Sequence, residues 1–451
     1  MASPSTGFPR DFFWGCATSA YQIEGAVAED GRAPSIWDTF AHTPGRIAGN
    51  DNADVAADHY HRWQEDLDLL QAMGANAYRF SVSWPRVVPQ GKGKTNAAGL
   101  GFYDRLVDGL LARGITPFVN LFHWDLPQAV QERGGWPARS TVDEFEEYAR
   151  AVAHRLGDRV TWWITHNEPF FSGVGGYFLG NFAPGIVDPV AALHASHHLL
   201  LSHARATRAI RSEVRGKATV GLALSLSAVH PASSSEADVQ AADRFDAFTN
   251  RWFLDPVMRG EYPAELAQRF APLRTPIQPG DMQEIHQPLD FLGVNYYSRA
   301  VVRYDDSTPF LEAAQVKPEQ GEFSLMWEVY PPGLFELLDR LWREYHPPLL
   351  LVTENGMPLA DVPDARGHVE DAERISFLSR HLAEVQRAMA RGIRVGGYFV
   401  WSLMDNFEWA LGYSMRFGLV YVDFASQKRI PKASAEWFRG VIQHGLPEGG
   451  A

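Results

Sequence analysis

The chain has 451 residues, of which 45 % are apolar and 21 % are charged, and these ordinary proportions exclude a generally disordered protein. Acidic residues outnumber basic residues by 54 to 41, so the formal charge is −13 and a nucleic-acid partner is not expected. The single cysteine, Cys16, excludes an intramolecular disulfide and fits a reducing compartment. The first residues show no secretory signal, and apolar stretches such as 395–404 are too short to span a bilayer. We therefore expect a cytoplasmic protein with no membrane partner.

Apolar or β-branched runs predict eight strands: 12–20, 77–84, 116–124, 161–165, 219–226, 291–297, 349–353 and 395–402. Each run is continuous rather than alternating, which is typical of parallel strands buried on both faces. Amphipathic stretches predict the helices between them: 55–73, 100–113, 141–156, 189–211, 237–254, 333–345, 371–391 and 432–443. Eight strands, each followed by a helix, predict an α/β fold, a single (β/α)8 TIM barrel over residues 1–451. A doubly wound open sheet is the less favoured alternative, because no Gly-rich phosphate turn follows the first strand.

The predicted loops differ in length at the two ends of the barrel. Turns from helix to strand are short, and Gly74, Gly114 and Gly392 each stand where a left-handed residue would end a helix. Loops from strand to helix are long: 21–54, 170–188, 298–332 and 358–370. Barrel active sites are built from the loops at the carboxyl ends of the strands, so we expect the site there.

Two glutamates follow predicted strands and are the strongest candidates for catalysis. Glu168 lies in Thr165-His166-Asn167-Glu168-Pro169, after the fourth strand, and Glu354 lies in Val352-Thr353-Glu354-Asn355-Gly356, after the seventh. Strands four and seven are three steps apart in an eight-strand ring, so the two carboxylates could meet across the mouth of the barrel. Two opposed carboxylates are what glycoside hydrolysis requires: one protonates the leaving oxygen, and the other attacks the anomeric carbon or activates a water.

The residues expected around this pair suit a sugar. Groups that can hydrogen-bond to hydroxyls lie at or just beyond strand ends: Gln22, His123, Asn167, Asn295, Tyr297 and Glu408. Flat aromatic faces for the C–H side of a sugar ring are offered by Trp124, Trp401 and Trp409. Arg79 lies inside the second strand, where a buried guanidinium needs an anion. We expect it to hold Glu354 ionised, with an ordinary structural salt bridge as the alternative.

Metal and cofactor chemistry receive little support from the sequence. Four histidines cluster on one predicted helix, His194, His197, His198 and His203, but that helix belongs to the outer ring, away from the mouth. Neither a P-loop, nor a G-x-S-x-G elbow, nor a dinucleotide fingerprint is present. We expect no metal and no cofactor.

The sequence resembles glycoside hydrolase family 1, the β-glucosidase family, along almost the whole chain. The motifs that carry the resemblance are Phe12-Phe13-Trp14-Gly15, Tyr78-Arg79-Phe80-Ser81, Leu121-Phe122-His123-Trp124-Asp125, Asn167-Glu168-Pro169, Asn295-Tyr296-Tyr297, Thr353-Glu354-Asn355-Gly356, Trp401-Ser402-Leu403-Met404-Asp405-Asn406-Phe407-Glu408-Trp409 and Arg416-Phe417-Gly418-Leu419. The resemblance implies a retaining mechanism, with Glu168 as acid/base and Glu354 as nucleophile. It places Gln22, His123, Asn167, Trp401, Glu408 and Trp409 on the non-reducing sugar, and Arg79 and Tyr297 on the nucleophile. Trp124, Asn295 and Phe417 are expected to line the substrate site, and Trp327 and Phe170 to lie beside the leaving group.

The expected substrates are β-glucosides and short β-linked gluco-oligosaccharides, and the oligomeric state stays open. At the roughly 5–5.5 Å separation of a retaining pair, both carboxyl groups cannot easily be charged. We therefore expect a raised pKa for Glu168, which would keep its proton.

Three alternative functions are weighed against this expectation. The first is a 6-phospho-β-glycosidase, which Glu408 would disfavour by repelling the phosphate. The others are an inactive sugar-binding relative, which would be expected to lack a glutamate, and a metal-dependent barrel hydrolase.

Overall fold

Eight parallel strands form a closed barrel in the computed structural model, which describes residues 7–447. The ring order is β1-β11-β10-β7-β5-β4-β3-β2, and β1 closes the ring on β11 through pairs such as Gly15 and Phe399. The strands are β1 (Phe13–Ala17), β2 (Ala77–Ser81), β3 (Thr116–Asn120), β4 (Trp162–Asn167), β5 (Thr219–Ser225), β7 (Phe291–Asn295), β10 (Leu350–Asn355) and β11 (Val395–Trp401). The eight predicted strands and the predicted (β/α)8 barrel are thus confirmed, and β4 lies three steps from β10.

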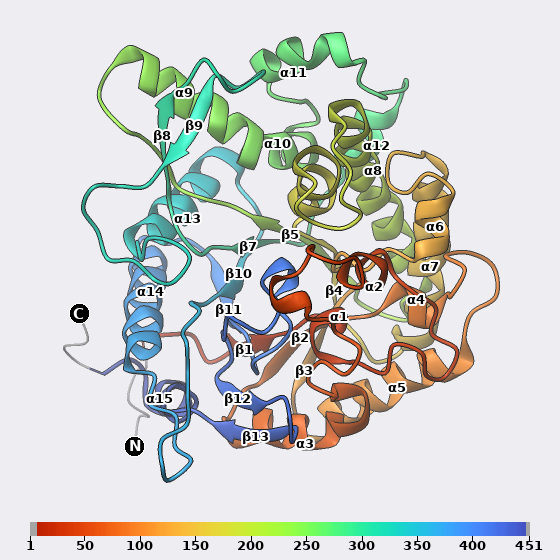
Figure 1. Cartoon of the computed structure of the whole chain (residues 1–451), viewed down its shortest axis with the longest axis vertical. Coiled ribbons are helices and arrows are strands. Elements are labelled where there is room, and N and C mark those ends of the chain that lie inside the picture. Colours follow the sequence, from red (N-terminus) through yellow and green to blue (C-terminus); the bar gives the residue numbers. More distant parts are fainter. Residues whose placement is uncertain (1–6, 448–451) are drawn as a thin grey trace.

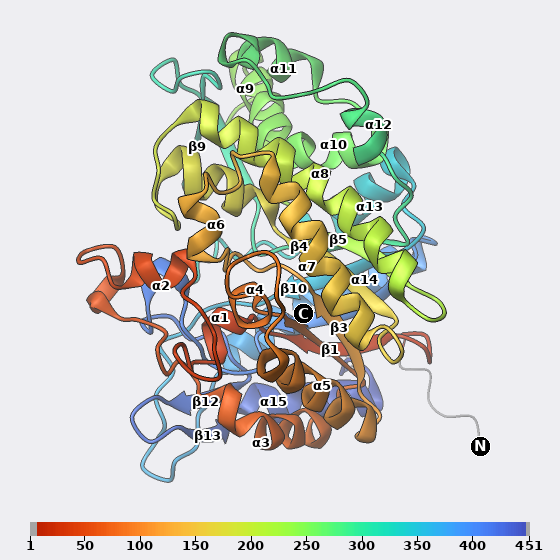
Figure 2. The same ribbon diagram turned by 90° about the vertical axis from the view of Figure 1, so that its right-hand side faces the viewer.

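Helices surround the strands on the outside of the barrel (Figures 1 and 2). They are α3 (His59–Ala72), α5 (Ala97–Ala112), α7 (Ser140–Leu156), α8 (Pro189–Glu213), α9 (Glu236–Asp246), α10 (Trp252–Arg259), α13 (Pro332–Tyr345), α14 (Ala372–Ala390) and α15 (Ala433–His444). Two predictions need correction. Val55, expected at the start of the apolar stripe of α3, precedes the helix and is 56 % exposed. The single helix expected over 237–254 is divided by a π-helical turn, Ala247–Arg251, between α9 and α10.

Burial on both faces explains the continuous apolar runs of the strands. Every residue of β2 and of β10 is buried, because neighbouring helices cover the outside of the sheet and side chains fill the inside. Arg79 in β2 and Glu354 in β10 are therefore charged groups placed among buried apolar neighbours. Such groups are stable only when paired.

Short elements within the loops were not predicted. Six helices belong to this group: α1 (Ala20–Ile23), α2 (Ile36–Ala41), α4 (Trp84–Val87), α6 (Gln128–Glu132), α11 (Ala264–Phe270) and α12 (Asp281–Ile285). A three-stranded sheet, β6 (Val229–Pro231), β8 (Ala300–Tyr304) and β9 (Ala313–Val316), stands at the top of Figure 1, and a hairpin, β12 (Val420–Asp423) and β13 (Lys428–Pro431), lies at the bottom. Most of these elements follow barrel strands, whereas α11 and α12 belong to the connection from α10 to β7, and α12 packs against α8.

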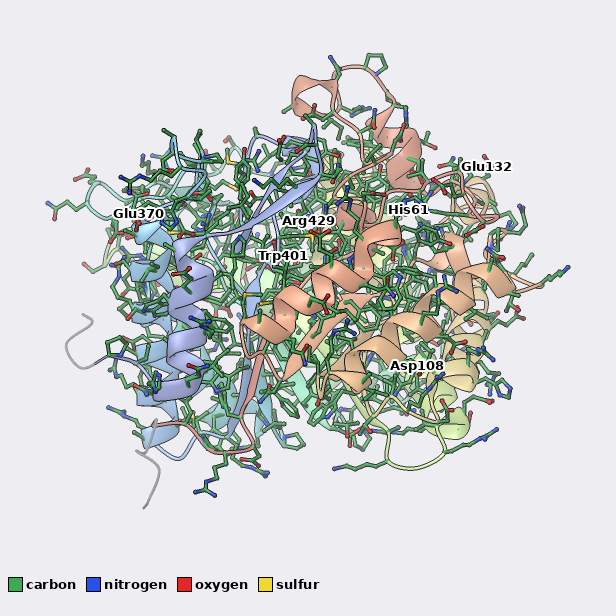
Figure 3. All side chains as sticks on the ribbon, turned by 90° about the horizontal axis from the view of Figure 1, so that it is seen from below. His61, Asp108, Glu132, Glu370, Trp401 and Arg429 are labelled. Carbon is green, nitrogen blue, oxygen red and sulfur yellow. The ribbon has the colours of Figure 1, made fainter. Side chains whose placement is uncertain are left out.

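Charged and aromatic side chains divide between the surface and the interior. In Figure 3, Asp108, Glu132 and Glu370 lie around the outside of the molecule, whereas Trp401, 3 % exposed, lies near the middle. No helix within residues 7–447 is both long enough and apolar enough to cross a membrane.

A buried ion cluster joins two loops at the mouth of the barrel. The Lys432 ammonium lies 2.5 Å from the Asp361 carboxylate and 2.7 Å from that of Asp405. Arg374 also reaches Asp361, at 2.8 Å, and Arg416 reaches Asp405, at 2.7 Å. Asp361 follows the strand that carries Glu354, and Asp405 follows β11. The cluster therefore holds these two loops in a fixed relation to each other.

Replacing Lys432 with methionine is expected to destabilise the protein by about 3–5 kcal/mol, because two buried carboxylates lose a shared cation. Thermal unfolding followed by circular dichroism would measure the loss. Lys428→Met is the matched control, since Lys428 is exposed on β13 and should change the midpoint little. Equal midpoints for the two variants would contradict a stabilising role for the cluster.

Candidate active site

A cavity of about 330 Å³ opens at the carboxyl ends of the barrel strands. Its walls bring together residues from six barrel strands or the loops after them: His123, Trp124, Glu168, Phe171, Phe182, Ser225, Tyr297, Met326, Trp327, Glu354, Trp401, Glu408, Trp409 and Phe417. Ten of these fourteen residues were predicted from the sequence. Four further predicted residues, Gln22, Arg79, Asn167 and Asn295, lie directly behind the wall and hydrogen-bond to groups that line it or to one another.

Glu168 enters the cavity through an irregular strand end. The pairing of β4 with β5 shifts register between Ile164 and Asn167, and the next residue, Glu168, has a φ of 46°, in the left-handed region. A side chain with a Cβ rarely adopts this conformation unless its surroundings impose it. Here the Glu168 N–H donates to the carbonyl of Ala223 at 2.9 Å, and Asn295 Nδ2 donates to Glu168 Oε1 at 2.9 Å. These contacts direct the carboxyl group into the cavity.

Glu354 is held at both carboxylate oxygens. Arg79 donates to Oε1, and the Tyr297 hydroxyl donates to Oε2 at 2.6 Å. A second nitrogen of the Arg79 guanidinium donates to Asn167 Oδ1 at 2.5 Å. Arg79 therefore links Glu354 to Asn167, the residue that directly precedes Glu168 in the sequence. The predicted pairing of Arg79 with Glu354 has the expected geometry, a charge-assisted hydrogen bond to a carboxylate that is 3 % exposed.

The electrostatics of the cavity separate the two glutamates. Burial, and after it the charge of Glu354, raises the pKa of Glu168 well above the ordinary carboxyl range, so Glu168 keeps its proton at neutral pH. Burial and the same charge raise the pKa of Glu408 to about 8. Burial and Glu354 also raise the pKa of Tyr297, which keeps its hydroxyl a hydrogen-bond donor. The cavity thus contains one carboxyl group held by a cation and two that keep their protons.

His123 is a neutral member of the site. Its ring nitrogens face two side-chain amides, Asn120 at 3.3 Å and Asn167 at 3.0 Å. Burial, reinforced by the positive charge of Arg79, lowers the pKa of His123 well below its usual value. A neutral imidazole has one donor and one acceptor nitrogen, which suits hydrogen bonding to a hydroxyl.

Aromatic rings form two groups in the cavity. Trp401 and Trp409 stack on the His123 ring, with centroid separations of 5.6 and 5.9 Å, and Trp124 lies 4.5 Å from Trp409. Trp327 belongs to the second group, with its ring centroid 5.1 Å from that of Tyr297 and 5.9 Å from that of Phe417. Both groups expose flat apolar faces of the kind that pack against sugar rings or aromatic leaving groups.

Gln22 and Glu408 meet at one edge of the cavity. Gln22 Nε2 lies 3.4 Å from Glu408 Oε2 and donates to the carbonyl of Phe407 at 2.9 Å. The Ser19 hydroxyl donates to Gln22 Oε1 at 2.6 Å. Gln22 follows β1 and Glu408 follows β11, so the closing seam of the barrel places these two polar groups together.

Four cavity residues were missed and one was misplaced. Phe171, Phe182 and Met326 line the wall from loops that carry no strand-end pattern. Ser225 is the last residue of β5, so it follows the same pattern of a polar residue at a strand end and could have been found by it. Phe170, expected beside the leaving group, instead has its ring against Phe248 and Phe253, at 5.7 and 6.0 Å. The π-helix Phe171–Leu179 begins one residue later and turns the Phe171 side chain, rather than that of Phe170, into the cavity.

The four clustered histidines point to separate partners. His197 contacts Asp281 at 2.9 Å, His198 contacts the carbonyl of Trp136 at 3.0 Å, His203 contacts Thr165 at 2.6 Å, and His194 reaches the carbonyl of Arg274 at 3.3 Å. Within the described residues, no group of three or more potential ligands is arranged to hold a metal ion.

Tyr297→Phe is expected to lower kcat/KM by about 10- to 100-fold, because a hydrogen bond to a charged carboxylate is worth about 1.5–3 kcal/mol. Hydrolysis of an aryl β-glucoside would measure the loss. Tyr296→Phe is the matched control, since the Tyr296 hydroxyl donates to the carbonyl of Tyr330 and not to Glu354. Equal kcat/KM values for the two variants would contradict a role of Tyr297 in supporting Glu354.

Comparison with known proteins agrees with this geometry. The model of glycosyl hydrolase family 1 matches residues 5–446, and the chain therefore belongs to glycosyl hydrolase family 1. Beta-glucosidase A of Thermotoga maritima is 45 % identical over 440 residues, which cover 97 % of this chain and 98 % of that protein. Thermostable beta-glucosidase B of Thermobispora bispora is 47 % identical over 454 residues, covering 99 % and 93 %. A solved structure of the Thermotoga maritima beta-glucosidase in complex with deoxynojirimycin superimposes with a TM-score of 0.93 at 43 % identity, covering 98 % of this chain and 99 % of that one.

Proposed function

We propose that this protein is a retaining β-glucosidase that removes terminal, non-reducing β-D-glucosyl units. The observation that carries the proposal is the asymmetric pair of glutamates, because Glu354 is held by Arg79 and Tyr297 while buried Glu168 keeps its proton. A charged carboxylate and a protonated one facing a single cavity are the two groups of a double displacement. The names of the similar proteins, beta-glucosidases of the same family, support the sugar specificity.

In the first step Glu354 attacks the anomeric carbon while Glu168 protonates the glycosidic oxygen. The carbon–oxygen bond to the leaving group breaks, the leaving group departs as an alcohol or phenol, and the sugar becomes an ester of Glu354. Ester formation removes the negative charge of Glu354, so the pKa of Glu168 falls. Glu168, now a carboxylate, takes a proton from a water that attacks the anomeric carbon. The products are glucose and free Glu354, and no step requires a metal or a cofactor.

The remaining cavity residues divide by the part of the substrate that they contact. We assign the terminal glucosyl unit to the residues near the closing seam and the His123 stack: Gln22, His123, Trp124, Asn167, Trp401, Glu408 and Trp409. Asn167 would hold the 2-hydroxyl, a contact that strengthens in the transition state. Trp327 and Phe417 would contact the leaving group, and Asn295 would position Glu168.

The proposed substrates are cello-oligosaccharides and aryl or alkyl β-glucosides. A 6-phospho-β-glycosidase is not favoured, because Glu408 lines the cavity and, among the described residues that line it, no lysine or arginine stands beside Glu408 to bind a phosphate. An inactive relative is not favoured either, because both glutamates face one cavity. The organisation of residues 1–451 as a single domain and the cytoplasmic location of the protein stay predictions.

The experiment that tests the proposal follows the anomer of the glucose released from 4-nitrophenyl β-glucoside by NMR. We expect β-glucose first, because two inversions restore the starting configuration. The rate constant kcat/KM should fall as the pH rises through the raised pKa of Glu168, since only the protonated acid can assist departure. Release of α-glucose first would contradict the double displacement, and no turnover at all would contradict the proposed function.

A further inference from the structure

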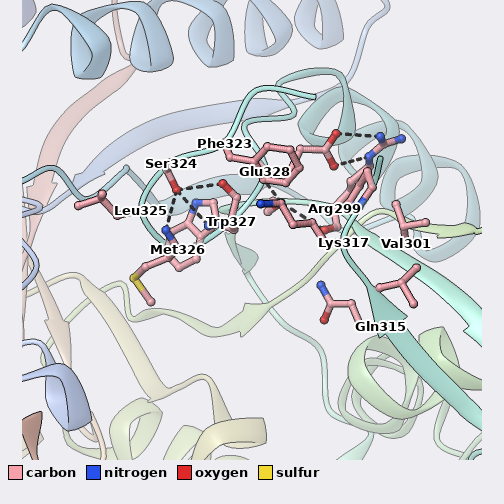
Figure 4. Close-up of a pocket in the computed structure, with 13 residues that line it drawn as sticks. Arg299, Val301, Gln315, Lys317, Phe323, Ser324, Leu325, Met326, Trp327 and Glu328 are labelled. Carbon is pink, nitrogen blue, oxygen red and sulfur yellow. Dashed lines mark hydrogen bonds and ion pairs between the residues drawn. The ribbon is translucent and has the colours of Figure 1, made fainter. Parts of the chain in front are cut away.

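A second cavity, of about 390 Å³, adjoins the catalytic one. Met326 and Trp327 line both cavities, so this pair of side chains stands between them. Figure 4 shows the second cavity beneath the loop that carries Phe323 and Trp327, with Gln315 of β9 across from that loop. We call it the outer pocket. Its position places it beyond Trp327 on the leaving-group side of the catalytic cavity.

The outer pocket contains one cation with no counter-charge. Three charged side chains line it, Arg299, Lys317 and Glu328. Arg299 and Glu328 neutralise each other through two hydrogen bonds of 2.7 and 2.8 Å, and Glu328 is buried. Lys317 instead holds its ammonium 4.1 Å from the centroid of the Phe323 ring (Figure 4). Among residues 7–447, no carboxylate lies within salt-bridge distance of this ammonium.

The position of Lys317 is set by the small sheet. β9 pairs with β8 through Val301 and Val316, and both of these residues line the outer pocket. Lys317 directly follows the last residue of β9, and Gln315, Val316 and Lys317 all line the outer pocket. The Phe323 ring attracts the charge of the ammonium, which favours the position of this exposed side chain at the pocket.

We propose that the outer pocket binds the far end of the leaving group and that Lys317 selects β-glucosides whose aromatic leaving group carries a carboxylate. The inference rests on the proposed function. The aromatic ring of such a leaving group would pack on Trp327 and Met326, and its carboxylate would reach the ammonium of Lys317. An uncharged extension would gain nothing from an unpaired cation.

The expected preference is moderate because Lys317 is exposed to solvent. A solvated ion pair of this kind should raise kcat/KM by about two- to fivefold. The preference should weaken with added salt, because ions screen exposed charges. It should reside mainly in KM, since the contact is remote from the bond that breaks and is made equally before and during reaction.

The test compares two leaving groups that differ only in charge. The substrates are 4-(2-carboxyethyl)phenyl β-D-glucoside and its primary amide, which leave with nearly equal ease. We expect the wild-type protein to favour the acid in kcat/KM, Lys317→Arg to keep the preference, and Lys317→Glu to shift the acid-to-amide ratio downward by about tenfold. Lys428→Glu is the control of equal charge change, since exposed Lys428 lies on β13 at the other end of the molecule in Figure 1.

The inference would be overturned by equal rates for acid and amide in the wild-type protein, by a preference that survives Lys317→Glu, or by the same shift in Lys428→Glu. The inference would also be overturned if Lys317→Glu changed the rate of cellotriose hydrolysis but left the acid-to-amide ratio unchanged. The outer pocket would then bind a sugar rather than a charged aromatic leaving group. Hydrolysis of the neutral amide by every variant separates these outcomes from failure of the proposed function. That failure would instead appear as no turnover of either substrate.

Discussion

Glu354→Ala is expected to lower kcat on the order of 10⁶-fold, the size of effect that follows removal of a catalytic nucleophile. Without the carboxylate no glycosyl ester forms, and the guanidinium of Arg79 and the hydroxyl of Tyr297 lose their shared partner. Added azide should occupy the space left by the side chain and attack an activated aryl β-glucoside directly. The product would be α-glucosyl azide, because only one displacement has occurred.

Glu354→Gln provides the matched control for this experiment. The amide fills the space that azide needs, so this variant should be inactive and should not respond to azide. Circular dichroism would establish that both variants are folded. Normal hydrolysis by Glu354→Ala, or a rescued product of β configuration, would remove Glu354 from the position of nucleophile.

Glu168→Ala is expected to slow cleavage of cellobiose by about 10²- to 10⁴-fold, the usual contribution of a positioned general acid. Cellobiose has a poor leaving group that needs a proton, whereas a dinitrophenyl group leaves unaided. The first step should therefore remain fast for a dinitrophenyl β-glucoside, while the second step slows because no base activates water. A burst of dinitrophenol followed by slow turnover would reveal the trapped glycosyl ester.

Azide distinguishes the two glutamates. In Glu168→Ala it should react with the ester on Glu354 and release β-glucosyl azide, the opposite configuration to that expected from Glu354→Ala. Asn295→Ala is a useful comparison, because it removes the 2.9 Å contact to Glu168 but leaves the acid in place. Cellobiose cleavage at the normal rate in Glu168→Ala would mean that another group supplies the proton.

The barrel could be predicted because its signals are local. Burial on both faces makes each strand a continuous apolar run, and the expected turn glycines, Gly74, Gly114 and Gly392, have φ values of 75°, 71° and 82°. The small sheet could not be predicted, because β6 and β9 have only three and four residues and lie within long loops. Val55 follows the helical spacing of α3, but its backbone precedes the helix, and spacing alone does not mark a helix start.

The catalytic pair could be predicted for a similar reason. Polar residues that end buried strands, such as Glu168 and Glu354, stand out in the sequence, and the ring order brings them together. The leaving-group side has no such signal. Phe171 and Met326 enter the cavity through the paths of the loops that carry them, which depend on packing between distant segments. The unpaired state of Lys317 could not be predicted either, because it depends on the tertiary structure. The carboxylate of Glu328, which lines the same pocket, is paired with Arg299 instead.

The seam between β1 and β11 has a consequence for when the protein can fold during its synthesis. Residues 13–17 pair with residues 397–401, so the ring closes only when segments almost four hundred positions apart have met. Contacts so distant along the chain form slowly, since a long loop must be ordered first. Gln22 follows β1 and Glu408 follows β11, so these two residues come together only when the seam has closed. A ribosome must therefore release nearly the whole polypeptide before the first glycoside can be cut.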